Sequence, residues 1–450
     1  MPAQERRNTE ALSQAGWIGP KRTDLGCSTW NILNRPSRTF HVEHPSTEVP
    51  QNVDFVQIRH RHTKSNGIFL WIKANSVILS QLSLFQVRNL QRVDWEPHPR
   101  ANLLLGANAQ GKTNLLESIF FLGTTKTLHQ AASPDDLIQH DASEALLRAR
   151  VIHQDGAITR DLEAQLKRGQ PKRFLLNFKK LSPLSKIFGQ LPVVLFTPED
   201  LDLVKAGPAA RRLYLDLEIS QASQAYLQDL AHYHRALKQR NAALKLHAEG
   251  RGSLDSIHAF DEALVQSGCA ILGFRLRAVA ALNLLAAEVQ RGLAGPDEHL
   301  ALHYRDSLGL DPAMAGDATA MAHQFRLRLR ERAREEQARG GTLSGPHRDD
   351  LDLQLNGRPA KLFASQGQQR CIALSLKLAE VRFLAGQLGE NPVLLLDDVL
   401  SELDLDRQAR LLSLLDSHVQ TFVTSTHATD LAYQPGQVLT LRDGQLSPNP

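Results

Sequence analysis

Residues 101–122, ANLLLGANAQGKTNLLESIFFL, decide the fold of this chain. The apolar run at 102–105 predicts a buried strand, and the run at 114–122 predicts a helix. Between them lies the pattern G-x-x-x-x-G-K-[ST], made of Gly106, Ala107, Asn108, Ala109, Gln110, Gly111, Lys112 and Thr113. A strand, a glycine-rich loop and a helix in this order predict a phosphate-binding loop.

The residue types in this loop indicate its chemistry. The glycines let the backbone wrap a phosphate chain, and the free amides at the start of the helix point toward it. We expect Lys112 to neutralise the β- and γ-phosphates of ATP and the Thr113 hydroxyl to ligate Mg²⁺.

A second predicted strand delivers two carboxylates. Residues 392–398, PVLLLDD, are typical of a fully buried strand with acids at its carboxyl end. We expect Asp397 to hold the Mg²⁺ shell and Asp398 to orient or deprotonate the attacking water. Together with Lys112, this pair predicts ATP hydrolysis.

A second helix start with phosphate-binding character precedes that strand. Ser365, Gly367 and Gln368 lie at a loop-to-helix junction, where amides and a hydroxyl suit a γ-phosphate. One subunit needs a single such helix start for one nucleotide, so we expect the second to face ATP held by another copy, in a dimer. The alternative interpretation is a glutamine-rich N-cap.

Two shorter motifs complete the set. Asp404, in the stretch SELD at 401–404, directly follows the paired aspartates, and His427 ends the next apolar run. A histidine at that strand end can hydrogen-bond the γ-phosphate and report its loss, although an isolated histidine is more often structural or solvated.

The rest of the chain is an α/β protein interrupted by helices. Runs typical of strands lie at 77–90, 93–106, 145–153, 174–178, 191–196, 420–426 and 437–446. Residues 207–339 instead have helical periodicity. We therefore predict an extension of unknown structure at 1–77, either disordered or a start-site artefact. The head follows at 78–206, an all-α lobe at 207–339, and the rest of the head at 340–450.

Composition excludes several classes of protein. A chain of 450 residues with 42% hydrophobic and 22% charged residues is not a small module, a fibrous repeat or a disordered tail. The three cysteines form no CxxC pair, which argues against a zinc site or a disulfide framework. We find no signal segment and expect no membrane-spanning window, so the chain is predicted to be cytoplasmic.

From about Val77 onward the sequence resembles the RecF family of recombination mediators, which have an ABC-type ATPase head. The resemblance rests on six stretches: NAQGKTNLLESI around Lys112, FTPEDLDLVKAGPAARRLYLD at 196–216, LKQRN at 237–241, GTLSGPHRDDL at 341–351, ASQGQQRCIALSLKLAE at 364–380 and LLLDDVLSELD at 394–404. It implies an ABC-type P-loop head built from both ends of the chain, with the helical lobe inserted.

The resemblance also implies a function. Lys112, Thr113, Asp397 and Asp398 would be the ATP and Mg²⁺ residues, and Ser365 and Gly367 would be signature residues that act across a homodimer. Asp404 and His427 match the D-loop and the switch histidine. The family implies weak ATP hydrolysis, binding to DNA at gaps and junctions, and work with RecO and RecR to load RecA.

The sequence departs from the family pattern in places. Where relatives carry an arginine after the phosphate-loop helix, only Lys126 and His129 remain for a basic role, and Cys371 replaces a more usual threonine. Gln190 and Glu199 are candidates for the Q-loop residue and neither is assigned, although Glu199 lies at a strand end like the other site residues. Residues 1–77 have no counterpart in the family.

Candidate DNA contacts lie in the helical block. Arg326, Arg330 and Arg334, at i, i+4 and i+8, form a basic stripe suited to phosphate contact without base readout. Interleaved glutamates favour the alternative of a solvated face with ion pairs. We interpret Arg211, Arg212 and the PHRDD segment at 346–350 as structural links between head and lobe.

Two other classes share the head motifs. A transporter ATP-binding subunit would have a short helical insertion and an LSGGQ-like signature, and a full-sized chromosome-organising ATPase would need hundreds of heptad residues. The insert of about 130 residues fits neither class. DNA stimulation of ATP hydrolysis separates the first alternative from a DNA-binding ATPase.

The formal charge of +4 lies in the extension. Residues 1–77 carry ten Lys and Arg against six Asp and Glu, so residues 78–450 are neutral and any DNA site must be a local patch. Because no methionine lies between Met1 and Met314, we hypothesise that translation starts near 77–82 from a non-AUG codon. The intact mass of the native protein tests this hypothesis.

Overall fold

The computed structural model describes residues 75–128, 133–153, 156–311, 314, 316–414, 418–426 and 435–448, and the statements below concern these residues. The predicted extension lies outside them apart from its last three residues. His129 and His427 also lie outside the described residues.

Strands from both ends of the chain form one mostly parallel sheet. Its order is β17 (Gln445–Pro448), β16 (Gln437–Arg442), β4 (Ala101–Leu105), β15 (Thr421–Ser425), β14 (Val393–Leu396) and β9 (Val193–Phe196). β4, β14 and β15 are buried at every residue, which explains the continuous apolar sequence VLLL of β14 and the run of leucines in β4. The predicted head, made from separate parts of the chain, is therefore confirmed.

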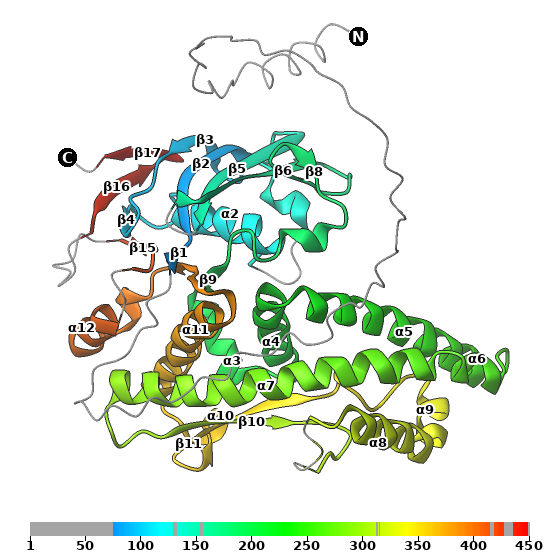
Figure 1. Cartoon of the computed structure of the whole chain (residues 1–450). Helices are drawn as coiled ribbons and strands as arrows, with labels where there is room; N and C mark the ends of the chain where they lie inside the picture. The colour runs from blue at the N-terminus through cyan, green and yellow to red at the C-terminus, as the bar shows by residue number, and fades with distance from the viewer. Residues whose placement is uncertain are drawn as a thin grey trace, which may run out of the picture. The chain divides into compact units, whose positions relative to one another are not determined.

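An antiparallel sheet covers the phosphate-loop helix. Its order is β3 (Leu90–Trp95), β2 (Ile78–Val87), β5 (Glu144–His153), β6 (Ile158–Lys167), β7 (Arg173–Leu176) and β8 (Lys179–Lys180). Alternate residues of β5 are buried, as expected for a sheet with one solvated face. α2 (Lys112–Thr124) contacts strands of both sheets and lies beneath the antiparallel one in Figure 1.

Two stretches that were each predicted to be one strand form two strands in the structure. The stretch 93–106 was expected to be one strand, but β3 and β4 belong to different sheets, because Pro97 and Pro99 interrupt the chain between them. The stretch 437–446 was also expected to be one strand. It is a hairpin of β16 and β17 that turns at Asp443 and Gly444, both with positive φ.

Helices and short strands fill the chain between the two halves of the head. The lobe elements are α3 (Asp202–Lys205), α4 (Pro208–Ala222), α5 (Gln224–Ala248), α6 (Leu254–His258), α7 (Asp261–Ala294), β10 (Leu300–Arg305), α8 (Ala318–Glu331) and α9 (Ala333–Arg339). After it come β11 (Asp350–Leu355), β12 (Arg358–Pro359), α10 (Ala360–Phe363), α11 (Gln366–Leu388), β13 (Glu390–Asn391) and α12 (Leu405–Leu414). β13 pairs in parallel with β1 (Asn75–Ser76).

Short 3₁₀ helices complete the described elements: η1 (Pro134–Leu137), η3 (Leu184–Ile187), η4 (Pro198–Leu201) and η6 (Leu400–Glu402). The block predicted to be all-α is helical apart from β10. That strand pairs antiparallel with β11, which lies beyond the predicted lobe boundary at 339. The lobe therefore continues into the segment that begins the second half of the head.

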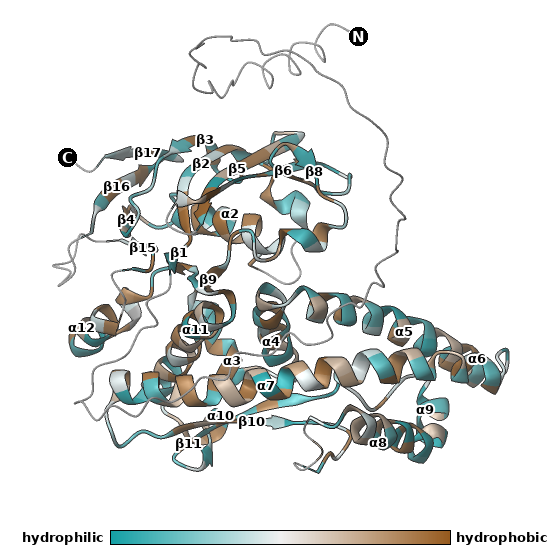
Figure 2. Ribbon diagram, in the orientation of Figure 1, coloured by the Kyte–Doolittle hydropathy of each residue, from teal (hydrophilic) through white to brown (hydrophobic). Residues whose placement is uncertain are grey.

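The long helix α7 changes one expectation of the sequence. The stretch Leu254–Ala294 is long and apolar enough, by length and composition alone, to cross a membrane. In the structure α7 packs against α5, α11 and β10, and its residues Leu264, Ile271, Leu272 and Leu282 are fully buried. Figure 2 shows apolar and polar residues alternating along it, which is the pattern of a core helix.

Candidate nucleotide site

The phosphate loop joins β4 to α2 in a backbone conformation that requires glycine. Gly111 has φ 107°, and a β-carbon added there would lie 2.6 Å from Oδ1 of Asn89. The Nζ of Lys112 donates hydrogen bonds to the carbonyl oxygens of Gly106 at 2.7 Å and Ala107 at 3.0 Å. The lysine is 7% exposed, so its charge is held within the loop.

Burial and the two predicted acids shift the pKa of Lys112 in opposite directions. Burial lowers the pKa of Lys112, and the nearby carboxylates of Asp398 and Asp397 raise it. The structure therefore places the lysine of the loop close enough to both acids that follow β14 for their charges to interact.

Asp397 is fixed by hydroxyl groups from two other strands or helices. Its Oδ2 accepts a hydrogen bond from Oγ1 of Thr113 at 2.7 Å, and its Oδ1 accepts one from Oγ1 of Thr424 at 2.8 Å. Burial raises the pKa of Asp397, while the hydrogen bonds from Thr113 and Thr424 lower it. Thr424 was not predicted, and it carries no distinct sequence signal because residues 420–426, QTFVTST, contain three threonines and a serine.

Asp398 is set in a conformation uncommon for a non-glycine residue. Its φ is 51°, and its amide donates to Oγ1 of Thr424 at 2.9 Å. Its Oδ1 is buried without a hydrogen-bond partner in the described part of the chain. A buried, unpaired carboxylate oxygen beside a phosphate loop fits a bound water, which can donate to it.

The donor set fits Mg²⁺. Thr113 and Asp397 supply oxygen atoms, the ligand type that Mg²⁺ prefers, and Mg²⁺ usually takes only one or two protein ligands besides phosphates and water. Within the described residues no cluster of three or more His, Cys, Asp or Glu side chains could hold a metal alone. This agrees with a metal that binds together with the nucleotide.

The predicted signature residues form a separate group at the start of α11. Ser365 caps the helix, since its Oγ accepts from the amide of Gln368 at 3.3 Å while the Gln368 side chain accepts from the Ser365 amide at 2.9 Å. Arg407 lies beside Gly367, and its backbone amide donates to Asp404 at 2.9 Å. Both the N-cap interpretation and a nucleotide-facing helix start agree with this geometry.

The signature group and the phosphate loop are not joined in one copy. Among the described residues, the side-chain hydrogen bonds of this group link its members to one another, to Arg407 and to Glu298, and none reaches residues 106–113. The side chains of the loop and those of the signature group therefore form two half-sites. His427, the remaining predicted site residue, lies outside the described residues.

One arginine of the predicted basic stripe is ion-paired in the structure. Arg326 forms two hydrogen bonds to Glu262, at 2.8 and 3.1 Å, and the helix breaks after Glu331, so Arg334 lies on α9 rather than α8. Neighbouring arginines pair with Glu331 and Glu335. Arg330 and Arg334 are exposed and form no side-chain hydrogen bond or ion pair with a described residue, so the ion-paired alternative holds for Arg326 alone.

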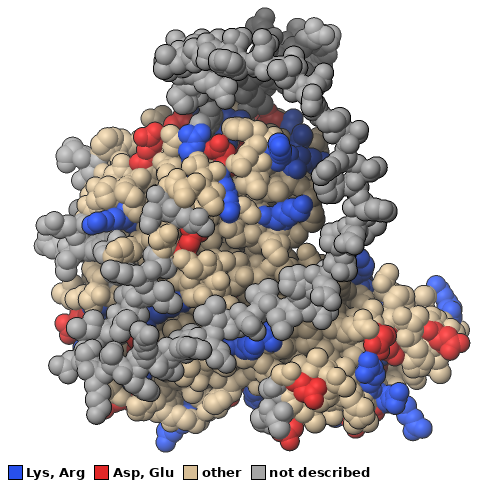
Figure 3. Space-filling view, viewed as in Figure 1, with Lys and Arg blue, Asp and Glu red and all other residues tan. Residues whose placement is uncertain are grey.

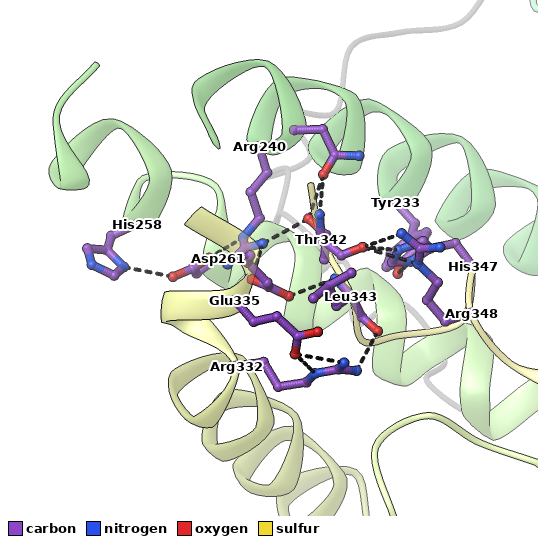
Figure 4. A network of polar contacts seen from close by, with 12 residues as sticks. Tyr233, Arg240, His258, Asp261, Arg332, Glu335, Thr342, Leu343, His347 and Arg348 are labelled. Carbon is purple, nitrogen blue, oxygen red and sulfur yellow. Dashed lines mark hydrogen bonds and ion pairs between the residues drawn. The ribbon is translucent and has the colours of Figure 1, made fainter. Parts of the chain in front are cut away.

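The segment 341–350 links head and lobe, as interpreted from the sequence. Arg211 pairs with Asp350 at 2.8 Å, and Arg212 donates to the Asp349 carbonyl oxygen at 2.7 Å. Farther out, Figure 4 shows Thr342 and His347 in a polar network with Tyr233 and Arg240. These contacts join α4 and α5 to the chain that leads back into the head.

A buried charge cluster, which sequence reasoning missed, lies where α4 meets α11. Nζ of Lys377 lies 2.7 Å from Oε2 of Glu380, and Glu218 is fully buried beside them. Burial and the neighbouring Glu380 raise the pKa of Glu218 well above its usual range. The cluster borders a cavity of about 950 Å³ that is also lined by Glu199, the Q-loop candidate. In sequence, Lys377 and Glu380 resemble an ordinary surface pair at i, i+3.

Comparison with known proteins identifies the family. A sequence profile of the RecF/RecN/SMC N terminal domain matches residues 78–440. A DNA replication and repair protein RecF from Staphylococcus aureus (strain bovine RF122 / ET3-1) is 39% identical over 357 residues, which cover 79% of this chain and 95% of that protein. The chain belongs to the RecF family. Another RecF, from Symbiobacterium thermophilum, is 41% identical over 353 residues, covering 78% of this chain and 92% of that protein.

Solved RecF structures share the fold. Two structures of the recombination mediator protein RecF in the RecFOR pathway, one with ATPrS and one with ATP, match with a TM-score of 0.77 at 31% and 30% identity. The matches cover 84% and 85% of this chain and 99% and 100% of the solved chains. The predicted family and the predicted ABC-type head with a helical insert are confirmed.

Proposed function

We propose that this chain is an ATP-dependent DNA-binding protein of recombinational repair and replication, with a weak ATPase activity that DNA stimulates. The observation that carries the proposal is the unit formed by Lys112, Thr113, Asp397 and Asp398. Lys112 lies in the loop, the Thr113 hydroxyl donates a hydrogen bond of 2.7 Å to the buried Asp397, and Asp398 has an unpaired oxygen. This set is suited to hydrolyse a nucleoside triphosphate.

Each side chain has a distinct task in this proposal. Lys112 exchanges its carbonyl partners for phosphate oxygens, and Thr113 and Asp397 hold Mg²⁺. When bound, Mg²⁺ neutralises phosphate charge. Asp398 orients the attacking water and accepts its proton, because one of its oxygens is buried and unpaired. His427 is proposed to contact the γ-phosphate.

The second half-site supports an ATP-dependent homodimer. Ser365 is exposed at the start of α11, and Leu362, Phe363 and Leu405 beside the signature and D-loop motifs are 73%, 61% and 78% exposed. Large apolar side chains at a charged rim are typical of an association surface. We propose that Ser365, Gly367, Gln368 and Asp404 of one copy close on the ATP bound to Lys112 of the other. Slow hydrolysis would then reopen the dimer.

The biological setting comes from the relatives. Those named above are DNA replication and repair proteins, and the solved ones belong to the RecFOR pathway. We propose that the closed dimer acts as a clamp at gapped or junction DNA in the cytoplasm and helps to load RecA with RecO and RecR.

The proposal is tested by the ATPase rate with and without duplex DNA and by retention of DNA with and without ATP. DNA should raise the rate, and ATP should raise retention in the natural chain but not in Lys112→Met. Absence of both effects in the natural chain would overturn the proposal and favour another class of ABC-type ATPase.

A further inference from the structure

A strongly basic segment stands out within residues 78–450, whose net charge as a whole is zero. Residues 164–198 contain no Asp or Glu. Their basic residues are Lys167, Arg168, Lys172, Arg173, Lys179, Lys180 and Lys186. An uninterrupted positive segment of this kind predicts a polyanionic partner if its side chains are free in the fold.

The structure separates the basic residues with internal partners from those without. Lys167 pairs with Glu144 at 2.9 Å, Arg168 donates to carbonyl oxygens of 139–142, and Lys172 donates to the Thr125 carbonyl oxygen at 2.7 Å. The remaining four are exposed and form no side-chain hydrogen bond or ion pair with any described residue. They are Arg173, Lys179, Lys180 and Lys186, and with Phe178 we call them the basic hairpin surface.

Acidic residues on the adjacent strand are already neutralised. Asp161 on β6 pairs with Arg150 at 2.9 Å, and Glu163 pairs with Arg148 at 2.7 Å. Figure 3 shows Lys and Arg side chains gathered on the part of the molecule where Figure 1 places β6 and β8. The positive charge of the basic hairpin surface is therefore available to a ligand.

An exposed aromatic ring lies at the tip of the same hairpin. Phe178 is 65% exposed and has φ 64°, and the preceding Asn177 has φ 49°. The turn is held to β6, because the Asn177 amide donates to the Asp161 carbonyl oxygen at 2.8 Å and Oδ1 of Asn177 accepts from the Asp161 amide at 2.9 Å. A large residue in the left-handed region, fixed in an exposed position, is uncommon and costs free energy.

The hairpin is also attached to the nucleotide-binding helix. Lys172 donates to the carbonyl oxygen of Thr125, the C-cap residue of α2, and its Nζ lies 5.6 Å from the ring centroid of Phe121 on that helix. The phosphate loop lies at the other end of α2. The ring of Phe174 on β7 also packs on Phe121, at 5.5 Å between ring centroids, so the hairpin rests directly on α2.

We propose that the basic hairpin surface binds a nucleic acid at a junction between duplex and single strand. Lys179, Lys180, Arg173 and Lys186 contact backbone phosphates, and Phe178 stacks on the first unpaired base. Charge complementarity selects a polyanion, and the fixed, exposed ring selects one with accessible base faces rather than an acidic protein. This inference rests on the proposed function and assigns the DNA contact to β7 and β8 instead of the stripe on α8 and α9.

Fluorescence anisotropy with labelled DNA tests the proposal in the full chain with ATP and Mg²⁺. Lys179→Ala/Lys180→Ala should weaken binding about tenfold and reduce the slope of log affinity against log salt by about two. Phe178→Ala should lower the affinity for junction DNA about tenfold while changing that for blunt duplex little. The matched control is Arg235→Ala/Lys238→Ala, which removes two exposed charges from α5.

The outcomes separate this inference from the proposed function. If the natural chain binds DNA and the hairpin variants bind equally well, or if the control loses as much affinity, the basic hairpin surface is not the DNA contact and the proposed function stands. If the natural chain binds no DNA in any nucleotide state, the result contradicts both this inference and the proposed function. Unchanged DNA binding with lost binding of poly-glutamate would overturn the inference and assign the surface to an acidic protein.

Discussion

The hydroxyl of Thr113 donates a hydrogen bond of 2.7 Å to the carboxylate of Asp397, 284 residues away in the sequence. This contact joins the start of α2 to the end of β14, and so unites the two separated parts of the head at the place where ATP and Mg²⁺ are proposed to bind. The geometry of the site therefore depends on the whole head being assembled.

Replacement of Lys112 by methionine should remove most nucleotide affinity. The substitution keeps the length of the side chain but removes a charge that lies within the loop and is 7% exposed. Loss of a charged hydrogen bond to phosphate costs about 3 kcal/mol, on the order of a hundredfold in affinity. Titration with a fluorescent ATP analogue measures this, with Lys205→Met on the exposed side of α3 as the control. Equal affinity in the two variants would contradict the role of Lys112.

Asp398→Asn should bind ATP but hydrolyse it at least about a hundredfold more slowly than the natural chain, because the amide cannot accept the proton of the attacking water. Single-turnover hydrolysis separates this step from binding. Asp255→Asn, an exposed carboxylate in the first turn of α6, should hydrolyse ATP at the natural rate. Unchanged hydrolysis in Asp398→Asn would exclude this residue as the base.

The nucleotide half-site was predictable from sequence because its signals are local. The loop 106–113 and the strand ending at Asp397 are contiguous patterns with a direct chemical meaning. The pairing of Thr424 with both acids was not predictable, because threonine is an ordinary strand residue and β15 contains two of them. His427, predicted from the same strand, lies outside the described residues.

Long-range pairing limited the prediction of the fold. β10 is a six-residue strand within helical sequence, and its partner β11 begins at Asp350, far along the chain. The sequence also could not show which charged residues are buried. Lys377 and Glu380 look like a solvated pair at i, i+3, although both are buried where α11 meets α4.

Lys377→Met should destabilise the protein. Burial would lower the pKa of Lys377, but the surrounding carboxylates, Glu380 above all, outweigh it and raise that pKa. Removing one partner of a buried pair leaves an uncompensated charge and costs about 3–5 kcal/mol. Urea unfolding measures the loss, and adding Glu380→Gln to the variant should recover part of it. A loss below about 1 kcal/mol would show that the pair contributes only as much as an exposed pair does.

His347 should make stability depend on pH. Its Nδ1 lies 2.6 Å from the Tyr233 hydroxyl and its Nε2 lies 3.1 Å from the Thr342 carbonyl oxygen, an arrangement that suits a neutral ring (Figure 4). Burial lowers the pKa of His347 to about 4, against the hydrogen bond to Thr342. The unfolded chain takes up the proton near pH 6.5, so this contribution to stability is complete above that pH and is lost as pH falls toward 4.

The expected loss from His347 is about 2 kcal/mol between about pH 7.5 and about pH 5. His347→Gln lacks the titrating group, so its free energy of unfolding should fall less over that range than that of the natural chain. Urea unfolding at the two pH values measures the difference. Identical pH dependence in the two proteins would show that His347 is not held neutral by the fold.

The central claim, that ATP closes two copies of this chain on DNA, is tested most directly by the mass of the Asp398→Asn variant in light scattering with junction DNA present. If ATP is held between two copies, the variant should be a dimer with ATP and Mg²⁺ and a monomer without nucleotide. A monomer under both conditions, or a dimer that forms equally without nucleotide, would contradict the claim.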